Sequence, residues 1–207
     1  MKVVVFGAQG GIGTQVVEQA LTAGHEVTAI VRRPLEVKLQ HERLQVIKGD
    51  VLEPATIREA IVGKDAVVSA LGVRSRAPTT LYSQGVANII QAMQAAHVRR
   101  LMCVSASGID PGPLWQRLFA KPILWLILKE MYSDLVRMET VVKASDLDWT
   151  ILRPPGFTNG PRTGRYQTAV NQHLSPGLSI SRADIADYIV THLNDRSTYG
   201  AWTEMAY

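Results

Sequence analysis

Cysteine is scarce in this sequence of 207 residues, and only 6% of the residues are aromatic. The single cysteine, Cys103, excludes an internal disulfide and any cysteine-rich metal cluster. The five histidines are dispersed, and no two have the spacing of metal ligands. We therefore expect no metal site, and a reducing compartment.

Long apolar runs are also missing. The densest, residues 122–128, is far shorter than the roughly 18 to 20 residues that cross a bilayer. The first residues pass from a short apolar strand straight into glycines, without the apolar region of a signal peptide. These absences predict a cytoplasmic protein with no membrane partner.

The composition that remains is that of a globular protein, with 46% hydrophobic and 19% charged residues. The length favours one domain over residues 1–207. The net charge of +4 comes from basic residues scattered in pairs, and no basic stretch is interleaved with aromatic residues. We therefore expect no nucleic-acid partner, and arginine pairs could instead meet a small polyanion.

Short apolar strands alternate with helical patterns through most of the chain. Between the expected strands, apolar residues recur at helical spacing. One such set is Val16, Val17, Ala20 and Leu21, which Gly24 follows. This alternation predicts an α/β fold, a Rossmann-like doubly wound parallel sheet with helices on both faces. The expected strands are 2–6, 25–31, 44–47, 66–69, 101–104 and 148–152.

The second half of the sequence is less regular. The apolar stretch 114–128 is interrupted by Pro122, which predicts two short helices with a kink. Residues 156–180 carry glycines and prolines with little periodicity and are expected to be loop-rich. Ser181 and Asp184 have the spacing of a capping box and open the last helix. We expect segments of about 108–132 and 156–180 to cover a substrate.

A glycine-rich loop joins the first expected strand to the first helix. Gly7, Gly10 and Gly13 form the pattern GxxGxxG. Gly7 permits a tight turn, Gly10 lets the backbone approach a pyrophosphate, and Gly13 lets helix and strand pack closely. The helix N-terminus then faces the pyrophosphate with free amides. A tight turn without any ligand is the alternative. The candidate cofactor residues here are Gly7, Gln9, Gly10, Gly11, Ile12 and Gly13.

Two arginines follow the second strand, where an NAD-binding protein usually has an acidic residue. Arg32 and Arg33 would instead pair with a 2′-phosphate, so the sequence favours NADP(H) as the cofactor. The alternative for each is a solvated loop charge.

The ends of the third and fourth strands supply further candidates. Asp50 could accept a hydrogen bond from the adenine amino group while Val51 packs on the ring; the alternative for Asp50 is an ordinary turn residue. Leu71 and Gly72 follow the fourth strand, at the sheet edge where such folds bind ligands. Gly72 would let the backbone approach the cofactor.

These motifs, with VSAS, DLDWTILRPPGF and TGRY further along, resemble the NAD(P)H-binding atypical short-chain reductases, specifically the flavin reductase/biliverdin reductase B group with its NmrA-like relatives. The resemblance covers nearly the whole chain. It implies NADPH at the glycine loop and a flat substrate over the nicotinamide. It also implies an active-site role for Arg74 and Ser105, and places Pro154 and Pro155 beside the nicotinamide. The histidine that this group has after the two prolines is Gly156 here.

The alternatives for the two active-site candidates are structural. Ser105 could be a strand-end cap, and Arg74 a solvated loop charge. None of the six tyrosines has a lysine four residues later, so the Tyr-x-x-x-Lys acid of ordinary short-chain dehydrogenases is absent. A lone serine hydroxyl is too weak an acid to protonate an alkoxide. This favours acceptors such as flavins, whose N5 takes the hydride while water supplies the other proton.

Two hypotheses about function follow. The first is an NADPH-dependent reductase that transfers hydride to a flavin, a tetrapyrrole, a quinone or another conjugated acceptor, mainly by positioning. The second is a non-catalytic NAD(P)-binding redox sensor of NmrA-like type. We expect a monomer or a weak homo-oligomer in either case.

Overall fold

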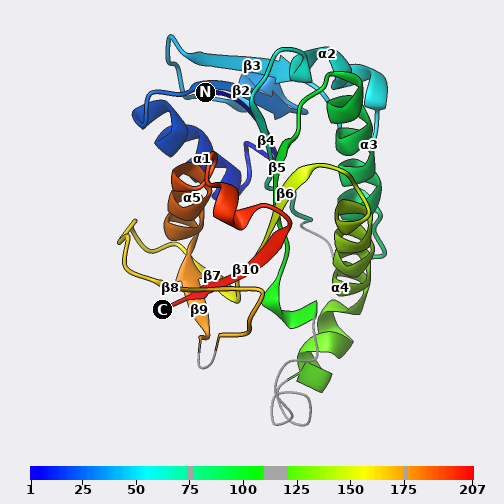
Figure 1. Ribbon diagram of the computed structural model, residues 1–207, viewed down its shortest axis with the longest axis vertical. Coiled ribbons are helices and arrows are strands. Elements are labelled where there is room, and N and C mark those ends of the chain that lie inside the picture. The colour runs from blue at the N-terminus through cyan, green and yellow to red at the C-terminus, as the bar shows by residue number, and fades with distance from the viewer. Residues whose placement is uncertain (74–76, 110–120, 175–176) are drawn as a thin grey trace.

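The computed structural model describes residues 1–73, 77–109, 121–174 and 177–207, and it is built around an eight-stranded sheet (Figure 1). The strand order is β3-β2-β1-β4-β5-β6-β10-β8, and among the strands of the described residues only β8 pairs antiparallel to its neighbour. This Rossmann-like arrangement confirms the predicted fold class. The strands of this sheet are β1 Lys2–Phe6, β2 Glu26–Val31, β3 Leu44–Lys48, β4 Ala66–Ser69, β5 Arg100–Val104, β6 Asp148–Arg153, β8 Gln167–Val170 and β10 Ala201–Ala206.

Helices cover both faces of the sheet (Figure 1). Side chains of β1 alternate between the two layers: Val3 and Val5 join one apolar core, and Val4 and Phe6 join the other. A strand buried on both faces reads as a continuous apolar run, which is why it was recognisable in the sequence. The first core includes α1 (Gly11–Thr22) and α5 (Arg182–Thr191); the second includes α2 (Arg58–Ile61), α3 (Leu81–Ala95) and α4 (Lys121–Lys143).

Of the two short helices predicted on either side of Pro122, the first lies outside the described residues, and the second is longer than predicted. One helix, α4, runs from Lys121 to Lys143. Pro122 lies in its first turn, where no intrahelical amide bond is lost, so the proline does not interrupt the helix. Residues 110–120 of the expected covering segment lie outside the described residues. In the described part of the chain, no helix has the length and hydropathy needed to span a membrane.

The C-terminal part contains strands that the sequence pattern did not predict. Residues 156–180, expected to be loop-rich, include β8 and most of a small parallel sheet of β7 (Gly156–Thr158) and β9 (Ser179–Ser181). The last strand, β10, pairs parallel with β6. The strands β7 and β8 are short and largely exposed, so their pairing with distant strands forms them rather than local periodicity.

The start of α5 combines the expected cap with an unexpected anchor. The Ser181 side chain accepts the Asp184 amide at 2.9 Å, as predicted. The Asp184 carboxylate does not return that bond; it accepts Thr163, Gly164 and Tyr207 instead. Burial works to raise the pKa of Asp184, but these hydrogen bonds together lower it. The anionic carboxylate thereby fastens the preceding loop and the C-terminus to α5.

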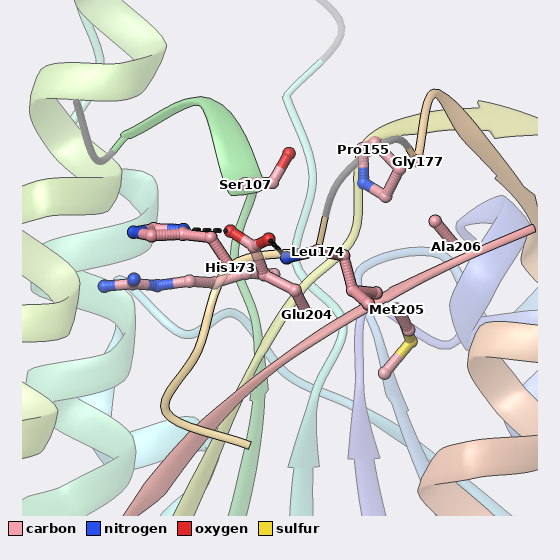
Figure 2. Close-up of a pocket in the computed structure, with 9 residues that line it drawn as sticks. Ser107, Pro155, His173, Leu174, Gly177, Glu204, Met205 and Ala206 are labelled. Carbon is pink, nitrogen blue, oxygen red and sulfur yellow. Dashed lines mark hydrogen bonds and ion pairs between the residues drawn. The ribbon is translucent and has the colours of Figure 1, made fainter. Parts of the chain in front are cut away.

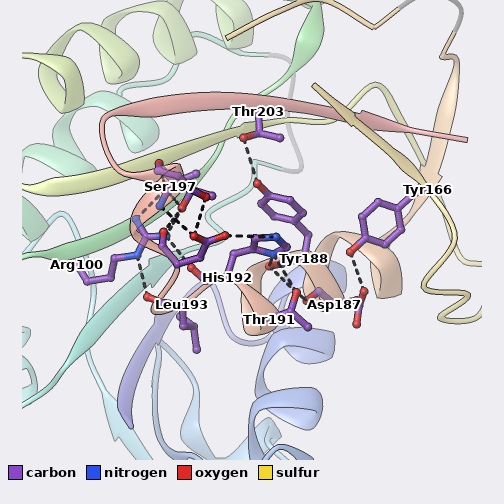
Figure 3. A network of polar contacts seen from close by, with 12 residues as sticks. Arg100, Tyr166, Asp187, Tyr188, Thr191, His192, Leu193, Ser197 and Thr203 are labelled. Carbon is purple, nitrogen blue, oxygen red and sulfur yellow. Dashed lines mark hydrogen bonds and ion pairs between the residues drawn. The ribbon is translucent and has the colours of Figure 1, made fainter. Parts of the chain in front are cut away.

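A buried arginine ties α5 and the following turn to the sheet (Figure 3). Arg100 opens β5 and is 4% exposed. Its guanidinium donates to the carbonyls of Leu193, His192 and Asp148 and to hydroxyls of nearby threonines. Burial lowers the pKa of Arg100. On the same helix, the Tyr188 ring stacks on His192 with 3.9 Å between centroids. This network lies at the amino end of the sheet strands.

We predict that Arg100→Met lowers the free energy of unfolding by at least about 3 kcal/mol, because each buried carbonyl left without a donor costs about 1 to 3 kcal/mol. Urea denaturation measures this loss. The matched control is Arg99→Met, whose side chain makes exposed ion pairs with Asp146 and Asp148. Equal midpoints for the two variants would contradict the structural role of Arg100.

Candidate functional site

The glycine-rich loop lies where the strand order reverses, between β1 and β4. Gly7 has a φ of +75°, and a Cβ placed on it would lie 2.3 Å from the carbonyl oxygen of Ala70. A Cβ on Gly13 would lie 2.1 Å from the Gly7 oxygen. Only glycine fits at either position, so the tight turn and the close packing of helix on strand occur as predicted. Open α/β sheets bind their ligands at this crevice.

The first turn of α1 leaves its amides available. Gly10 is the N-cap residue, it supplies no side-chain cap, and no acidic residue lies in the first turn. The amides of Gly11, Ile12 and Gly13 have no intrahelical acceptors. The Gln9 side chain donates to the carbonyl of Arg33 at 3.0 Å and so joins the loop to the end of β2. Free amides and the helix dipole together suit a pyrophosphate.

The two arginines after β2 differ in their surroundings. The Arg33 guanidinium pairs with Glu36 at 3.0 Å, at an exposed position. Arg32 is exposed, and none of the described residues forms an ion pair with it. Both lie beside the glycine-rich loop, because β1 and β2 are neighbours and Gln9 reaches Arg33. Arg32 is therefore the better placed of the two to bind a phosphate.

The ends of β3 and β4 place the other expected cofactor residues nearby. One Asp50 carboxylate oxygen accepts the Leu52 amide at 2.9 Å, so this residue also shapes its own turn. Val51 is 6% exposed and packs against Gly85 of α3, within the core. Leu71 is half-buried beside it, whereas a Cβ on Gly72 would meet nothing within 4 Å. The adenine contacts expected of Asp50 and Val51 stay predictions.

Ser105 follows β5 and is buried against an ion pair. Its hydroxyl donates to Glu139 of α4 at 2.8 Å, and both residues are less than 5% exposed. Glu139 also accepts Arg153 of β6 through Nε at 2.9 Å, and Lys143 at 2.9 Å. The one proton of Ser105 is thus directed at a buried carboxylate. Arg74, the second active-site candidate, lies outside the described residues.

A pocket opens at the carboxyl ends of β6 and β10 (Figure 2). Pro155, the second residue of the expected nicotinamide turn, lines it, together with Ser107 after β5. Pro154 is buried next to it and its carbonyl accepts the Ser107 amide at 3.0 Å. His173 and Glu204 line the same pocket, with 2.9 Å between His173 Nδ1 and a Glu204 oxygen. Sequence reasoning missed this pair, because it depends on the unpredicted strand β10.

Arg182 is a second residue that sequence reasoning missed. It is the first residue of α5, and its side chain crosses the start of α1: a Cβ on Gly11 would lie 2.5 Å from Arg182 Cδ. One guanidinium nitrogen donates to Asn159 at 2.5 Å, and the Phe157 ring lies 5.5 Å from the cation. The Arg182 side chain thus lies against Gly11, the first residue of α1. The only sequence signal was its place inside the capping box.

Together, a doubly wound sheet and a phosphate cradle at its switch point define a dinucleotide-binding α/β protein. The chain belongs to the NAD(P)H-binding family, which it matches over residues 7–196. A chloroplastic protein of Arabidopsis thaliana is 31% identical over 201 residues, which are 93% of this chain and 71% of that protein.

Solved structures share this fold. A short-chain dehydrogenase/reductase of the wide type from Veillonella parvula, in complex with NADP, has a TM-score of 0.83 at 19% identity and covers 100% of this chain and 94% of its own. ChuY, an anaerobillin reductase from Escherichia coli, has a TM-score of 0.80 at 22% identity, with 100% and 97% covered. At these identities the likeness is one of fold.

We predict that Arg182→Met weakens the binding of NADP⁺ and NAD⁺ alike, by roughly tenfold or more. Both dinucleotides carry the pyrophosphate, and a charge-assisted hydrogen bond is worth about 1.5 to 3 kcal/mol. Isothermal titration calorimetry measures both affinities. Arg165→Met, the same loss of charge at an exposed residue before β8, is the control. Unchanged affinities in Arg182→Met would show that this guanidinium does not contact the cofactor.

Proposed function

We propose that the protein is an NADPH-dependent reductase that transfers hydride to a conjugated acceptor such as a flavin, a tetrapyrrole or a quinone. Membership of the NAD(P)H-binding family supports the cofactor class. The resident dinucleotide would supply the hydride from its nicotinamide ring. The residues of the chain bind it, orient it and exclude water.

The proposed cofactor path follows the carboxyl edge of the sheet. The amides at the start of α1 and the Arg182 guanidinium would hold the pyrophosphate, and Arg32 the 2′-phosphate. Asp50 and Val51 would bind the adenine, and Leu71 and Gly72 would line the middle of the path. Pro154 and Pro155 would border the nicotinamide, next to the pocket after β6.

The observation that carries the choice of acceptor is the bond between Ser105 and Glu139. In ordinary short-chain dehydrogenases this strand end works with a Tyr-x-x-x-Lys pair, and the sequence has no such pair. Here the Ser105 hydroxyl faces a buried carboxylate that Arg153 and Lys143 also bind. Such a hydroxyl holds neighbouring strands in place and is unsuited to protonating an alkoxide. A conjugated acceptor, which delocalises the incoming charge, suits this site better.

A panel of acceptors tests the proposal. Purified protein is mixed with NADPH and, separately, FMN, riboflavin, biliverdin and quinones, while the absorbance of NADPH is followed. We expect oxidation of NADPH with at least one of them. Tight binding of NADPH without turnover of any acceptor, together with a partner captured only in its presence, would instead favour a redox sensor.

The preference for NADPH is tested at the two arginines. We predict that Arg32→Ala weakens NADPH binding by tenfold or more and leaves NADH binding nearly unchanged, because the lost contact is charge-assisted. Arg33→Ala should have a smaller effect, since its guanidinium already pairs with Glu36. Fluorescence titration with both dinucleotides measures this. Equal affinities for NADPH and NADH before and after the changes would show that the assignment is wrong.

A further inference from the structure

A histidine and a carboxylate from distant parts of the chain meet in the pocket beside Pro155 (Figure 2). Glu204, on β10, is 6% exposed. One of its oxygens lies 2.9 Å from His173 Nδ1, and the other accepts the Leu174 amide at 2.8 Å. A carboxylate can only accept hydrogen bonds, so the ring hydrogen resides on Nδ1. Two bonds to one buried carboxylate fix the position of the histidine.

The other ring nitrogen of His173 remains available. None of the described residues bonds Nε2, and the side chain is 36% exposed. The imidazole ring also contacts the Trp202 ring of β10, with 5.1 Å between the two ring centroids. With Nδ1 bonded to Glu204, Nε2 carries a hydrogen only in the imidazolium form. It can then give that proton to a molecule in the pocket and recover it from water.

The charges around the ring suit this exchange. Glu204 faces it from β10, with one carboxylate oxygen 2.9 Å from Nδ1. Arg153 of β6 lines the same pocket, and its guanidinium lies 4.3 Å from the centre of the Trp202 ring. The charge of Arg153 is balanced by Glu139 of α4. His173 thus pairs with Glu204, whereas the nearby Arg153 pairs with Glu139.

We propose that His173, oriented by Glu204, donates the proton that the acceptor needs during its reduction. This rests on the reductase function proposed above, and it names the acceptors: conjugated molecules whose reduction leaves negative charge on oxygen or nitrogen, as in quinones and tetrapyrroles. Hydride from NADPH forms a new bond to the acceptor, and a π electron pair moves onto the heteroatom. That atom takes the proton from Nε2. NADPH leaves as NADP⁺, the acceptor has gained two electrons, and water returns a proton to His173.

The place of the pair fits this role. Pro155, in the turn that we assign to the nicotinamide, and His173 line the same pocket. Glu204 is a positioning residue, because its two oxygens accept the His173 ring nitrogen and the Leu174 amide and so fix the ring in the pocket that both residues line. Hydrogen-bonded carboxylate and imidazole groups are a recurrent arrangement of general acids and bases.

The test uses His173→Asn. The asparagine amide can take the place of Nδ1 and still donate to Glu204, but it has no proton to give at the position of Nε2. With a quinone or biliverdin, we expect kcat to fall about a hundredfold or more. His41→Asn, in the loop before β3, is the matched control and should behave as wild type.

Flavin reduction separates this inference from the proposed function. Because water can supply the second proton of a flavin, His173→Asn should keep flavin turnover within a few-fold of wild type. Wild-type rates of His173→Asn with quinones and biliverdin would overturn the role of His173 alone. Turnover restricted to flavins would overturn it too. If no acceptor oxidises NADPH, the reductase function fails, and the proton donor fails with it.

A second measurement does not depend on activity. In protein labelled with ¹⁵N in its histidine rings, the His173 signals are those lost in His173→Asn. We expect neutral His173 to carry its hydrogen on Nδ1, and a quinone to shift the Nε2 signal. A hydrogen on Nε2 in the neutral ring would overturn the arrangement with Glu204. The same spectra show whether the variant is folded.

Discussion

The carboxyl edge of the sheet depends on one buried carboxylate, that of Glu139. It binds Ser105 after β5, Arg153 at the end of β6 and Lys143 one turn along α4. Burying charges costs several kcal/mol each, and the cost is offset only when geometry and hydrogen bonding are good. Here the two buried partners of Glu139 are Ser105, which follows β5, and Arg153, at the end of the adjacent strand β6. Glu139 itself lies on α4, the helix that covers these strands. The ion pair therefore fixes how α4 lies over the edge where the cofactor and acceptor are expected.

The same ion pair is the basis of the chemistry that we propose at Ser105. Its hydroxyl completes the shell of Glu139, and Arg153 extends the arrangement outward by lying over the Trp202 ring. Trp202 in turn contacts His173. A chain of contacts that begins at Glu139 of α4 thus ends at His173, which lines the pocket. Proton transfer in our proposal occurs where this network reaches solvent.

The sequence predicted what local pattern controls and missed what distant pairing creates. Apolar runs and the glycine spacing gave the central strands, the phosphate loop and both helical layers, because burial on two faces and the need for glycine at Gly7 and Gly13 act locally. Beyond Pro122, the predicted short helix and the helix predicted after it form one continuous helix, α4, which the apolar spacing alone did not join. Arg182 and the His173–Glu204 pair could not be found this way. Each joins segments that only the folded sheet brings together.

Strand β10 shows how a usable signal was nevertheless present. Along Ala201–Ala206, Thr203 and Met205 face the α5 layer, where Thr203 lies 3.3 Å from the Tyr188 hydroxyl and Met205 joins the core. The intervening Trp202 and Glu204 therefore point to the α4 side, because side chains alternate along a strand. A glutamate in a strand buried on both faces is costly unless a partner reaches it. The buried acid in such a strand itself indicates that a donor must lie opposite, and here that donor is His173.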